Sequence, residues 1–423
     1  MGVEWQYNPV HHGEWQLAGI PTTEPTLAWR QSFDHSIVGV SATADTLYVA
    51  AGKTVRMLTA DGSVMAATTT EERLLGPPTA DDAGAVFATA NDELRAVTAT
   101  GDLLWTQPLE GLSTVPAAVT EDFVIVATRD NGVCALDRES GATRWRFDTD
   151  EWVQTAPAVA AGTAFVGGRD DCLRALDLES GAELWCIEAA DNFEGPPTVV
   201  DGVVYAGTNN GRVYAVAADS GVKQWDYTVG GYVQTAPAVV NGQVVVGTDH
   251  GSVYGLDTAD GSLNWKSEGF GIIRCPPVAT DEAVIVGDQG GKLACLDAKT
   301  GSEQWTRDAG GKLTRAPAVM ESGLIYGTSN GDVFALQMST TAKTAPTTTE
   351  STGDTQIYDS GETVNTPSAP PAWEYCPTCG EHLTAVDTAV SPDITHCPHC
   401  GTDVTGLDGP KFCPGCGTDL TRL

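Results

Sequence analysis

Three cysteine pairs near the C-terminal end are the residues best suited to chemistry. They occur in the segments YCPTCG, HCPHCG and FCPGCG, each with two thiols three residues apart and a glycine after the second. Zn²⁺ takes four such ligands in a tetrahedron, so two pairs form one closed structural site without an open position for catalysis. The predicted zinc ligands are Cys376, Cys379, Cys397, Cys400, Cys413 and Cys416.

Which pairs share a metal ion stays open. Seventeen residues separate the first pair from the second, and twelve separate the second from the third. The first spacing lies in the usual range for two-knuckle zinc sites, and at either spacing the segment resembles a rubredoxin-like zinc ribbon. The remaining pair can share a zinc with another chain, recruit His382, His396 or His399, or stay without metal.

The charge of the chain is strongly negative. It has 56 acidic and 23 basic residues and a formal net charge of -33. Nucleic-acid binding needs clustered lysine and arginine against phosphates, so we do not expect it. The composition of the C-terminal tail supports the same conclusion. Residues 373–423 contain seven acidic residues and only two basic ones, Lys411 and Arg422. This acidic, lysine-poor composition resembles that of proteins from extreme halophiles.

The first residues and the cysteine usage bear on the compartment. The start MGVEWQYNPVHHGEW has neither the basic nor the apolar region of a signal peptide. We find no run of about 18 apolar residues, so we expect no membrane span. Clustered thiols in a metal-binding pattern are typical of a reducing compartment. We therefore expect a cytoplasmic protein.

Most of the chain is a repeat of 40 residues, and this repeat is the scaffold that would position a functional site. Prolines and glycines keep the same step as the tryptophans Trp105, Trp145, Trp185, Trp225, Trp265 and Trp305. In the unit from Tyr232 to Gly269, the turns Asn-Gly, Asp-His-Gly and Asp-Gly join four short segments of strand-forming residues. A four-stranded antiparallel sheet of about 40 residues, repeated in series, is typical of a β-propeller blade.

Counting the units predicts eight blades. Their cores begin near Val38, Leu75, Val115, Thr155, Gly195, Thr235, Cys275 and Arg315. The tryptophan strand recurs six times, and Met65, 40 residues before Trp105, is interpreted as a diverged seventh. The last core is not followed by such a strand. The N-terminal segment LAWRQSF, which contains Trp29, supplies the missing strand. We predict an all-β, eight-bladed β-propeller, closed by an N-terminal strand from Leu27 to Phe33 that removes an exposed edge.

The chain then divides into four parts. An N-terminal segment covers residues 1–26 and the propeller covers 27–338. Residues 339–372 are rich in Thr, Ser and Pro and lose the apolar pattern, so we interpret them as a flexible linker. Residues 373–423 form the zinc-ribbon region with its three CxxC knuckles.

The repeat carries a resemblance to a known family. ALDRESGATRW, ALDLESGAELW, GLDTADGSLNW and CLDAKTGSEQW are similar to the tryptophan-docking repeat of the pyrroloquinoline-quinone (PQQ)-type propellers. That superfamily includes PQQ-dependent dehydrogenases and non-catalytic members such as the propeller lipoprotein of the outer-membrane barrel-assembly machinery. The enzymes resemble one another in a Ca²⁺ site, a catalytic Asp and, in alcohol dehydrogenases, adjacent bonded cysteines. This chain has no adjacent cysteine pair, and no residue can be matched to the catalytic Asp, so we do not expect PQQ.

The loops before the prolines are the candidate binding surface. The residues three before each proline form a polar column of Ser113, Gln154, Glu194, Gln234, Arg274 and Thr314. The aromatic residues Trp152, Phe193 and Tyr232 stand just upstream. A polar ring with aromatic neighbours at one channel mouth can hold a ligand or peptide, although solvated loops have the same composition.

These patterns favour a non-catalytic binding or scaffold protein. The propeller face and the zinc ribbon would each contact a protein partner, and two linked modules gain avidity from effective concentration. The alternative is a PQQ-dependent dehydrogenase-like oxidoreductase that uses the propeller channel, a hypothesis based on fold resemblance.

The repeated residues also have expected structural roles. Each tryptophan is expected to pack between adjacent sheets. Turn-capping aspartates are predicted at Asp137, Asp177, Asp257 and Asp297. Small apolar roles, without disulfides, are expected for Cys134, Cys172, Cys186, Cys275 and Cys295.

Overall fold

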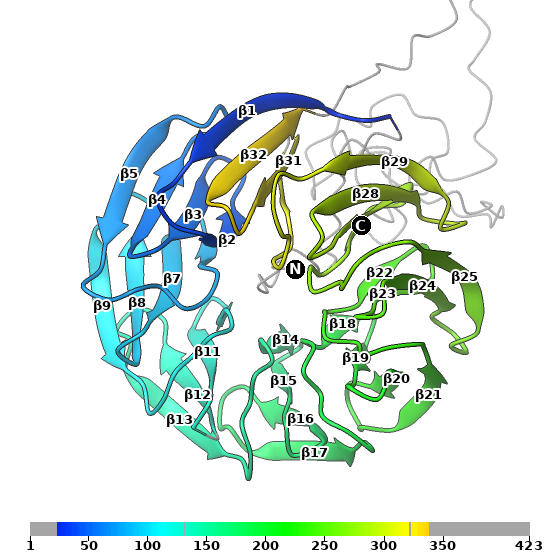
Figure 1. The fold of residues 1–423 in the computed structure, drawn as a ribbon. Helices are drawn as coiled ribbons and strands as arrows, with labels where there is room; N and C mark the ends of the chain where they lie inside the picture. The colour runs from blue at the N-terminus through cyan, green and yellow to red at the C-terminus, as the bar shows by residue number, and fades with distance from the viewer. Residues whose placement is uncertain (1–22, 131, 321–322, 338–423) are drawn as a thin grey trace, which may run out of the picture. The chain divides into compact units, whose positions relative to one another are not determined.

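The computed structural model of the chain describes residues 23–130, 132–320 and 323–337. Over these residues it contains only β-strands, in eight four-stranded antiparallel sheets, and Figure 1 shows the sheets arranged as blades around a central axis. The predicted all-β, eight-bladed propeller is therefore confirmed. Within the same residues no helix is long and apolar enough to cross a membrane.

The first four blades run from the innermost to the outermost strand as follows. Blade 1 contains β2 (Ile37–Ala42), β3 (Leu47–Ala51), β4 (Thr54–Leu58) and β5 (Val64–Thr69). Blade 2 contains β6 (Thr79–Asp81), β7 (Gly84–Thr89), β8 (Glu93–Thr98) and β9 (Leu103–Pro108). Blade 3 contains β10 (Ala118–Val119), β11 (Phe123–Thr128), β12 (Gly132–Asp137) and β13 (Thr143–Asp148). Blade 4 contains β14 (Ala158–Ala160), β15 (Thr163–Gly167), β16 (Cys172–Asp177) and β17 (Glu183–Glu188).

The remaining blades continue the same order. Blade 5 contains β18 (Thr198–Val200), β19 (Val203–Gly207), β20 (Arg212–Ala217) and β21 (Lys223–Thr228). Blade 6 contains β22 (Ala238–Val240), β23 (Gln243–Gly247), β24 (Ser252–Asp257) and β25 (Leu263–Glu268). Blade 7 contains β26 (Val278–Ala279), β27 (Ala283–Gly287), β28 (Lys292–Asp297) and β29 (Glu303–Asp308). Blade 8 contains β30 (Ala318–Met320), β31 (Gly323–Gly327), β32 (Asp332–Gln337) and, from the other end of the chain, β1 (Thr26–Ser32).

Turn chemistry explains the tight hairpins within a blade. Between β22 and β23, Asn241 and Gly242 both have positive φ, at 50° and 68°. Two such residues make the turn whose twist matches an antiparallel pair, and asparagine and glycine adopt it at the lowest cost. The turn after β24 uses Asp257, whose Oδ1 accepts the Ala259 N–H at 2.8 Å. Asp137, Asp177 and Asp297 cap equivalent turns, as the sequence predicts.

The repeated tryptophans join neighbouring blades. Trp105 Nε1 donates to the Arg138 carbonyl in blade 3 at 2.9 Å, and the indole lies against Gly141 of that blade. Gly141 has a φ of 71°, and a Cβ there would lie 2.6 Å from the indole, so turn and packing both require glycine. The same bond into the next blade is made by Trp145, Trp185, Trp225 and Trp265. The predicted packing of these side chains between sheets is therefore confirmed.

Blade 1 departs from this pattern. The diverged outer strand that Met65 marks is present as β5, but Met65 does not hold the tryptophan position. Ala66 pairs with Met57 as Trp105 pairs with Ala96, so Ala66 holds the tryptophan position. The repeat is 39 residues long at this point, because Met65 forms the bulge one residue earlier. The space beside Gly101 of blade 2, where a Cβ would stand, is bordered instead by Thr68, Met57 and Ala66. The long, flexible Met57 side chain, fully buried, fills part of the volume of the missing indole.

The N-terminal strand closes the ring, as predicted, over Thr26–Ser32 rather than Leu27–Phe33. It pairs antiparallel with β32 and places Trp29 against blade 1, where Trp29 Nε1 donates to the Ala60 carbonyl at 2.9 Å. Arg30 donates two hydrogen bonds, at 3.1 and 2.8 Å, to the Asp332 carboxylate. Blade 8 is thereby built from both ends of the propeller.

The cysteines of the described residues behave as core side chains. Cys134, Cys172, Cys275 and Cys295 are buried, Cys186 is half-buried, and none forms a disulfide. Burial raises the pKa of Cys134 to about 11 and that of Cys275 to about 12, because the thiolate loses its solvation. These two thiols are therefore protonated at neutral pH and poor nucleophiles.

Candidate functional site

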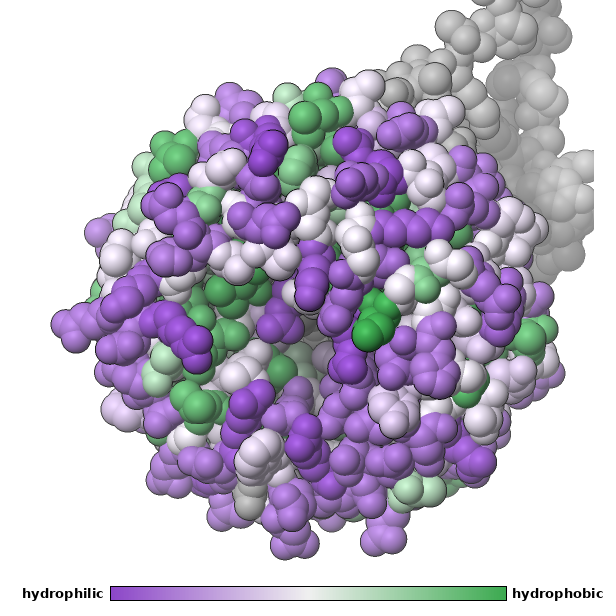
Figure 2. All heavy atoms as spheres, viewed as in Figure 1, coloured by the Kyte–Doolittle hydropathy of each residue, from purple (hydrophilic) through white to green (hydrophobic). Residues whose placement is uncertain are grey.

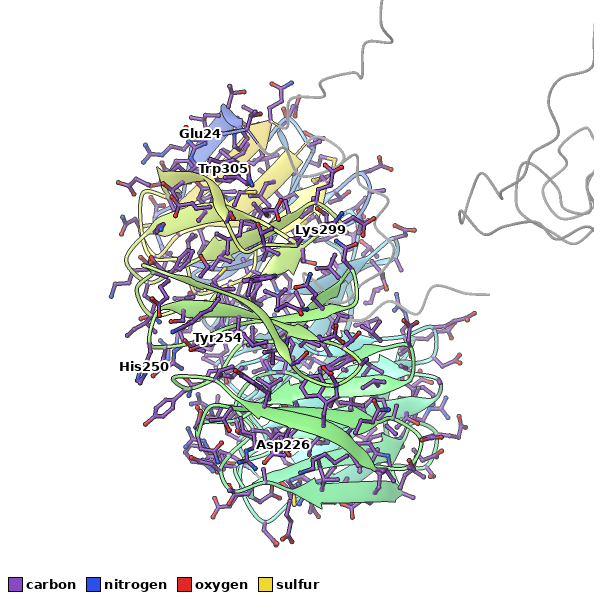
Figure 3. The ribbon with its side chains drawn as sticks, turned by 90° about the vertical axis from the view of Figure 1, so that its right-hand side faces the viewer. Glu24, Asp226, His250, Tyr254, Lys299 and Trp305 are labelled. Carbon is purple, nitrogen blue, oxygen red and sulfur yellow. The ribbon has the colours of Figure 1, made fainter. Side chains whose placement is uncertain are left out.

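Two sets of loops form one face of the ring, here called the mouth face. It comprises the loops that lead into each innermost strand and the turns between the second and third strands of each blade. Backbone hydrogen bonds tie the two sets together, as from Arg169 N to the Trp152 carbonyl at 2.9 Å. Figure 3 shows His250, from such a turn, on the opposite side of the ring from Lys299, in the turn between β28 and β29.

The mouth face is mostly polar and hollowed at its centre. It faces the viewer in Figure 2, where hydrophilic residues surround a depression at the propeller axis. Exposed large apolar side chains are few on this face: Trp152 (41% exposed), Tyr232 (48%) and Ile272 (43%). These three stand at steps of 80 and 40 residues. They therefore occupy equivalent positions in the loops that lead into blades 4, 6 and 7.

Among these three side chains, Trp152 is the one that two arginine side chains contact. The guanidinium carbons of Arg129 and Arg169 lie 5.9 and 5.3 Å from its ring centroid. Both distances are within the range in which a cation is attracted to the ring face. Arg129 comes from the turn after β11 and Arg169 from the turn after β15. Residues of two neighbouring blades thus hold one exposed indole, and we call these three residues the Trp152 clamp.

A hydrogen-bonded chain extends the clamp across the next two blades. Arg169 Nη2 lies 2.7 Å from Glu194 Oε1, and Gln234 Nε2 donates to Glu194 Oε2 at 2.5 Å. The same Gln234 amide donates to Asn209 Oδ1 at 2.8 Å. Glu194 therefore joins an arginine of blade 4 to a glutamine that leads into blade 6. This arrangement holds the three side chains in fixed positions.

The other predicted mouth residues lie on the same face with fewer partners. Gln154 and Arg274 are half-buried in the loops before β14 and β26. The Nε atoms of Arg129, Arg169 and Arg274 are buried without a hydrogen-bond partner among the described residues. Tyr232 is fixed through its backbone, whose N–H donates to Asp249 Oδ1 at 2.6 Å.

Two residues predicted at the mouth, Ser113 of the polar column and the upstream aromatic Phe193, are buried instead. Ser113 is 1% exposed and is equivalent in the repeat to the buried Val153. This shift occurs because the proline of blade 3, Pro116, stands one residue earlier than in the other blades. The mouth position there belongs to Thr114. Phe193 is fully buried and packs on Tyr214, with ring centroids 5.7 Å apart. It is a core residue, because it stands at the position of the buried Val153 and Val233, and Asn192 is the residue equivalent to Trp152.

The prediction missed the residues that complete the clamp and the chain. Arg129, Arg169 and Asn209 are not adjacent to any proline and belong to a different set of turns. A signal for them exists, because they too stand 40 residues apart, in the turn that follows the second strand of each blade. A comparison of all columns of the repeat, rather than those beside proline, would have found them.

An acidic region adjoins the clamp. Burial raises the pKa of Asp171, and the nearby carboxylates of Asp191, Asp170 and Glu188 raise it further. Asp170 is held by Arg174, whose Nη1 donates to it at 2.9 Å. The mouth face therefore places guanidinium groups and carboxylates side by side.

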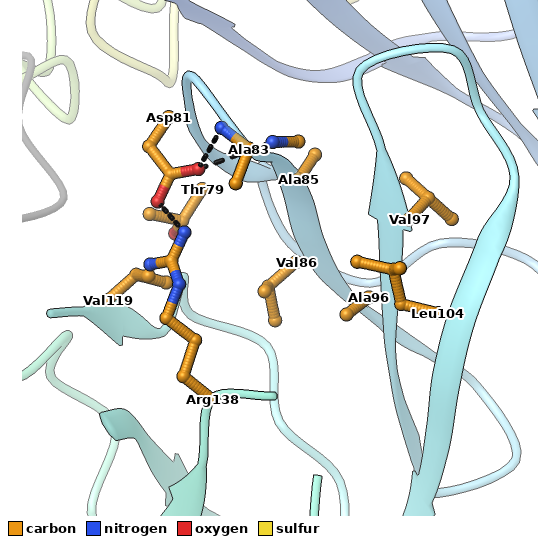
Figure 4. Close-up of a pocket in the computed structure, with 11 residues that line it drawn as sticks. Thr79, Asp81, Ala83, Ala85, Val86, Ala96, Val97, Leu104, Val119 and Arg138 are labelled. Carbon is orange, nitrogen blue, oxygen red and sulfur yellow. Dashed lines mark hydrogen bonds and ion pairs between the residues drawn. The ribbon is translucent and has the colours of Figure 1, made fainter. Parts of the chain in front are cut away.

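Figure 4 shows a second recess, between blades 2 and 3 on the face opposite the mouth. It measures about 290 Å³ including open solvent and is lined mainly by small apolar side chains such as Val86 and Ala96. Its two charged groups, Asp81 and Arg138, pair with each other. Asp81 also accepts the Ala83 N–H at 2.9 Å. Because Asp81 and Arg138 are paired with groups of the protein itself, we assign the recess a structural role at the blade interface.

The predicted zinc ligands, Cys376, Cys379, Cys397, Cys400, Cys413 and Cys416, lie outside the described residues, as does the linker. Zinc binding by the tail therefore stays a prediction. In the part of the chain that the structure covers, no group of three or more His, Cys, Asp or Glu side chains could hold a metal ion.

Solved structures share this fold at low sequence identity. BamB from Moraxella catarrhalis is 24% identical, with a TM-score of 0.67, and the match covers 74% of this chain and 99% of that one. The computationally designed Ika8 protein is 15% identical, with a TM-score of 0.67, over 75% and 100% of the two chains. The quinohemoprotein alcohol dehydrogenase ADHIIG from Pseudomonas putida HK5 is 13% identical, with a TM-score of 0.62, over 80% and 79%. At these identities the likeness shows the fold alone.

Sequence comparison gives the family. None of the curated protein sequences matches this chain. The family model described as outer membrane protein assembly factor BamB matches residues 21–111, 90–192, 169–271 and 267–345. These overlapping matches span every blade of the propeller and most of the chain. The chain therefore belongs to this BamB-type family of PQQ-like propeller repeat proteins.

Proposed function

We propose that this chain is a non-catalytic binding protein that engages a protein partner through the mouth face. The observation that carries the proposal is the Trp152 clamp, in which two arginines from neighbouring blades hold one exposed indole. Tryptophan, tyrosine and arginine are the residues that most often dominate binding energy at protein interfaces. All three types meet on this face, where Tyr232 and Arg274 lie farther around the ring.

Preorganisation supports the same role. Arg169 is fixed by Glu194, and Glu194 by Gln234, so these side chains lose little conformational freedom when a partner binds. The description of the family as an assembly factor, and the fold shared with BamB, agree with a role in protein interaction.

The clamp can be tested with two exposed residues of one blade. We expect Trp152→Ala to reduce capture of the main partner from native lysate at least about tenfold, as loss of a hot-spot side chain does. Leu184→Ala is the matched control, because Leu184 is 53% exposed but lies on the outer strand β17. The partner is identified by quantitative mass spectrometry and its affinity measured with purified protein. Equal capture by both variants would contradict the proposal.

The tail would supply a second contact. In this proposal two of the three cysteine pairs bind one structural Zn²⁺, and the ribbon contacts the same protein partner. A tethered second module raises affinity through effective concentration. Comparing capture by the full chain and by residues 1–338 tests this part separately. We place the protein in the cytoplasm, without membrane or nucleic-acid partners.

The alternative, a PQQ-dependent dehydrogenase-like oxidoreductase, rests on the fold shared with a quinohemoprotein alcohol dehydrogenase at 13% identity. Saturable binding of PQQ with Ca²⁺, followed by dye-coupled oxidation of an alcohol or sugar, would establish it. Our proposal expects neither binding nor turnover.

A further inference from the structure

The outer strands of two adjacent blades differ from all the others in charge. Neither β5 (VMAATT) nor β9 (LLWTQP) contains a charged residue. Each of the other six outer strands has at least one, among them Arg30 in β1, Arg144 in β13, Glu183 in β17, Lys223 in β21, Lys266 in β25 and Glu303 in β29. In a chain with a net charge of -33, two neighbouring uncharged strands are an exception.

The same two strands expose large apolar side chains. Val64 and Met65 at the start of β5 are 53% and 49% exposed, and Leu103 and Leu104 at the start of β9 are 57% and 55% exposed. The equivalent positions of β29 are Glu303 and the exposed Gln304. We call β5 and β9 together the neutral rim, and Figure 1 shows them side by side at the periphery.

The backbone of the neutral rim is open to pairing. Both strands end their sheets, so one edge of each lacks a neighbour within its blade. Natural proteins protect such edges with charged residues or proline, because an open edge is a template for another strand. β9 has Pro108 at its end, whereas β5 has neither kind of protection. The chain itself uses strand addition at this periphery, where β1 pairs with β32 to complete blade 8.

We propose that two copies of this chain associate through the neutral rim, with β5 of one copy pairing antiparallel to β5 of the other. Electrostatic repulsion between two such acidic copies favours contact where the surface is uncharged. A two-fold axis that sets Ala66 against Ala67 of the second copy places Val64 opposite Thr69 and Met65 opposite Thr68. Small residues then meet at the centre, and apolar side chains are covered at both ends. The two mouth faces stay free.

Two lysine variants test this contact at equal net charge. The purified full chain is studied by sedimentation equilibrium in buffered KCl over a range of concentrations. We expect the wild type to reach twice its mass of 44.2 kDa. Met65→Lys should remain at 44.2 kDa, because the pairing would bury an unpaired ammonium group. Gln304→Lys, at the equivalent position of β29, should associate like the wild type.

Hydrogen exchange locates the interface independently. Amides of β5 should become more protected as the wild type associates, and those of β29 should not change. A wild type that stays monomeric, a Met65→Lys variant that still forms the dimer, or a dimer that leaves β5 unprotected would each overturn the proposal. Far-ultraviolet circular dichroism and the unfolding midpoint confirm that both variants are folded.

Discussion

At the scale of single residues, burial divides the tryptophans into two groups. Trp145 is 9% exposed, and its Nε1 donates to the Leu178 carbonyl of the next blade at 2.8 Å. Trp152, seven residues later, is 41% exposed and is held by arginine side chains rather than by a core. Burial therefore assigns Trp145 to stability and leaves the Trp152 indole accessible for the partner contact that we propose.

This assignment predicts that the same substitution destabilises the fold to very different extents at the two positions. Trp145→Ala should lower the free energy of unfolding by about 3–5 kcal/mol, because it removes a buried indole and leaves a cavity between blades. Trp152→Ala should lower it by less than about 1 kcal/mol, as exposed positions do. Urea unfolding followed by circular dichroism measures both. Equal losses would show that Trp152 is part of the core.

At the scale of elements, the closing strand decides whether the ring is sealed. β1 pairs with β32, and its Ser32 and Arg30 side chains both hydrogen-bond to the Asp332 carboxylate, which is 9% exposed. These hydrogen bonds, from Arg30 first and then Ser32, lower the pKa of Asp332 despite its partial burial. The ends of the propeller are thus joined by a charge pair as well as by backbone pairing.

The lowered pKa of Asp332 gives a pH prediction. A carboxyl with a folded-state pKa below its unfolded value of about 3.9 stabilises the fold above that value. The stabilisation is lost as the pH falls through the folded-state pKa. Asp332→Asn should therefore be less stable than wild type at pH 7, and the difference should shrink below about pH 4. Urea unfolding at several pH values checks this, and a constant difference would argue against the mechanism.

At the scale of the whole molecule, neighbouring blades of the propeller form a core from their own residues. Each interface between blades has buried apolar residues from both sides, as with Trp105 and Leu136 between blades 2 and 3. The predicted zinc ligands all belong to the last 48 residues. Because the free energy of metal binding stabilises the segment that supplies the ligands, zinc should support the tail alone.

Metal removal separates the two parts. We expect one Zn²⁺ per chain by elemental analysis if two knuckles share a site. A strong chelator should remove it without shifting the thermal midpoint of the propeller. Replacing Cys397 and Cys400 by serine should abolish zinc binding, because the central pair takes part whichever neighbour it joins. Zinc retained by that variant would show that the outer pairs coordinate together.

The repeat by itself determined the fold. Trp, Pro and Gly at 40-residue steps, with turn residues such as Asn241-Gly242, predicted the strands, the eight blades and the closing role of Trp29. These inferences succeed because turn chemistry and strand alternation depend on residues close in the sequence. The positions assigned to Met65, within a strand that does form, and to Ser113 are each displaced by one residue. The repeat step shifts by one at both places, and a fixed count of 40 residues does not follow that shift.

Only the tertiary structure decided which polar residues meet. Trp152 lies 23 residues from Arg129 and 17 from Arg169 in the sequence, and the three come together because blade packing brings separate turns to one face. The neutral rim likewise becomes a surface only when β5 and β9 fall in adjacent blades with free edges. The periodic pattern determines the strands and turns of each blade. The two proposed binding surfaces depend instead on contacts between blades, and no local sequence pattern encodes such contacts.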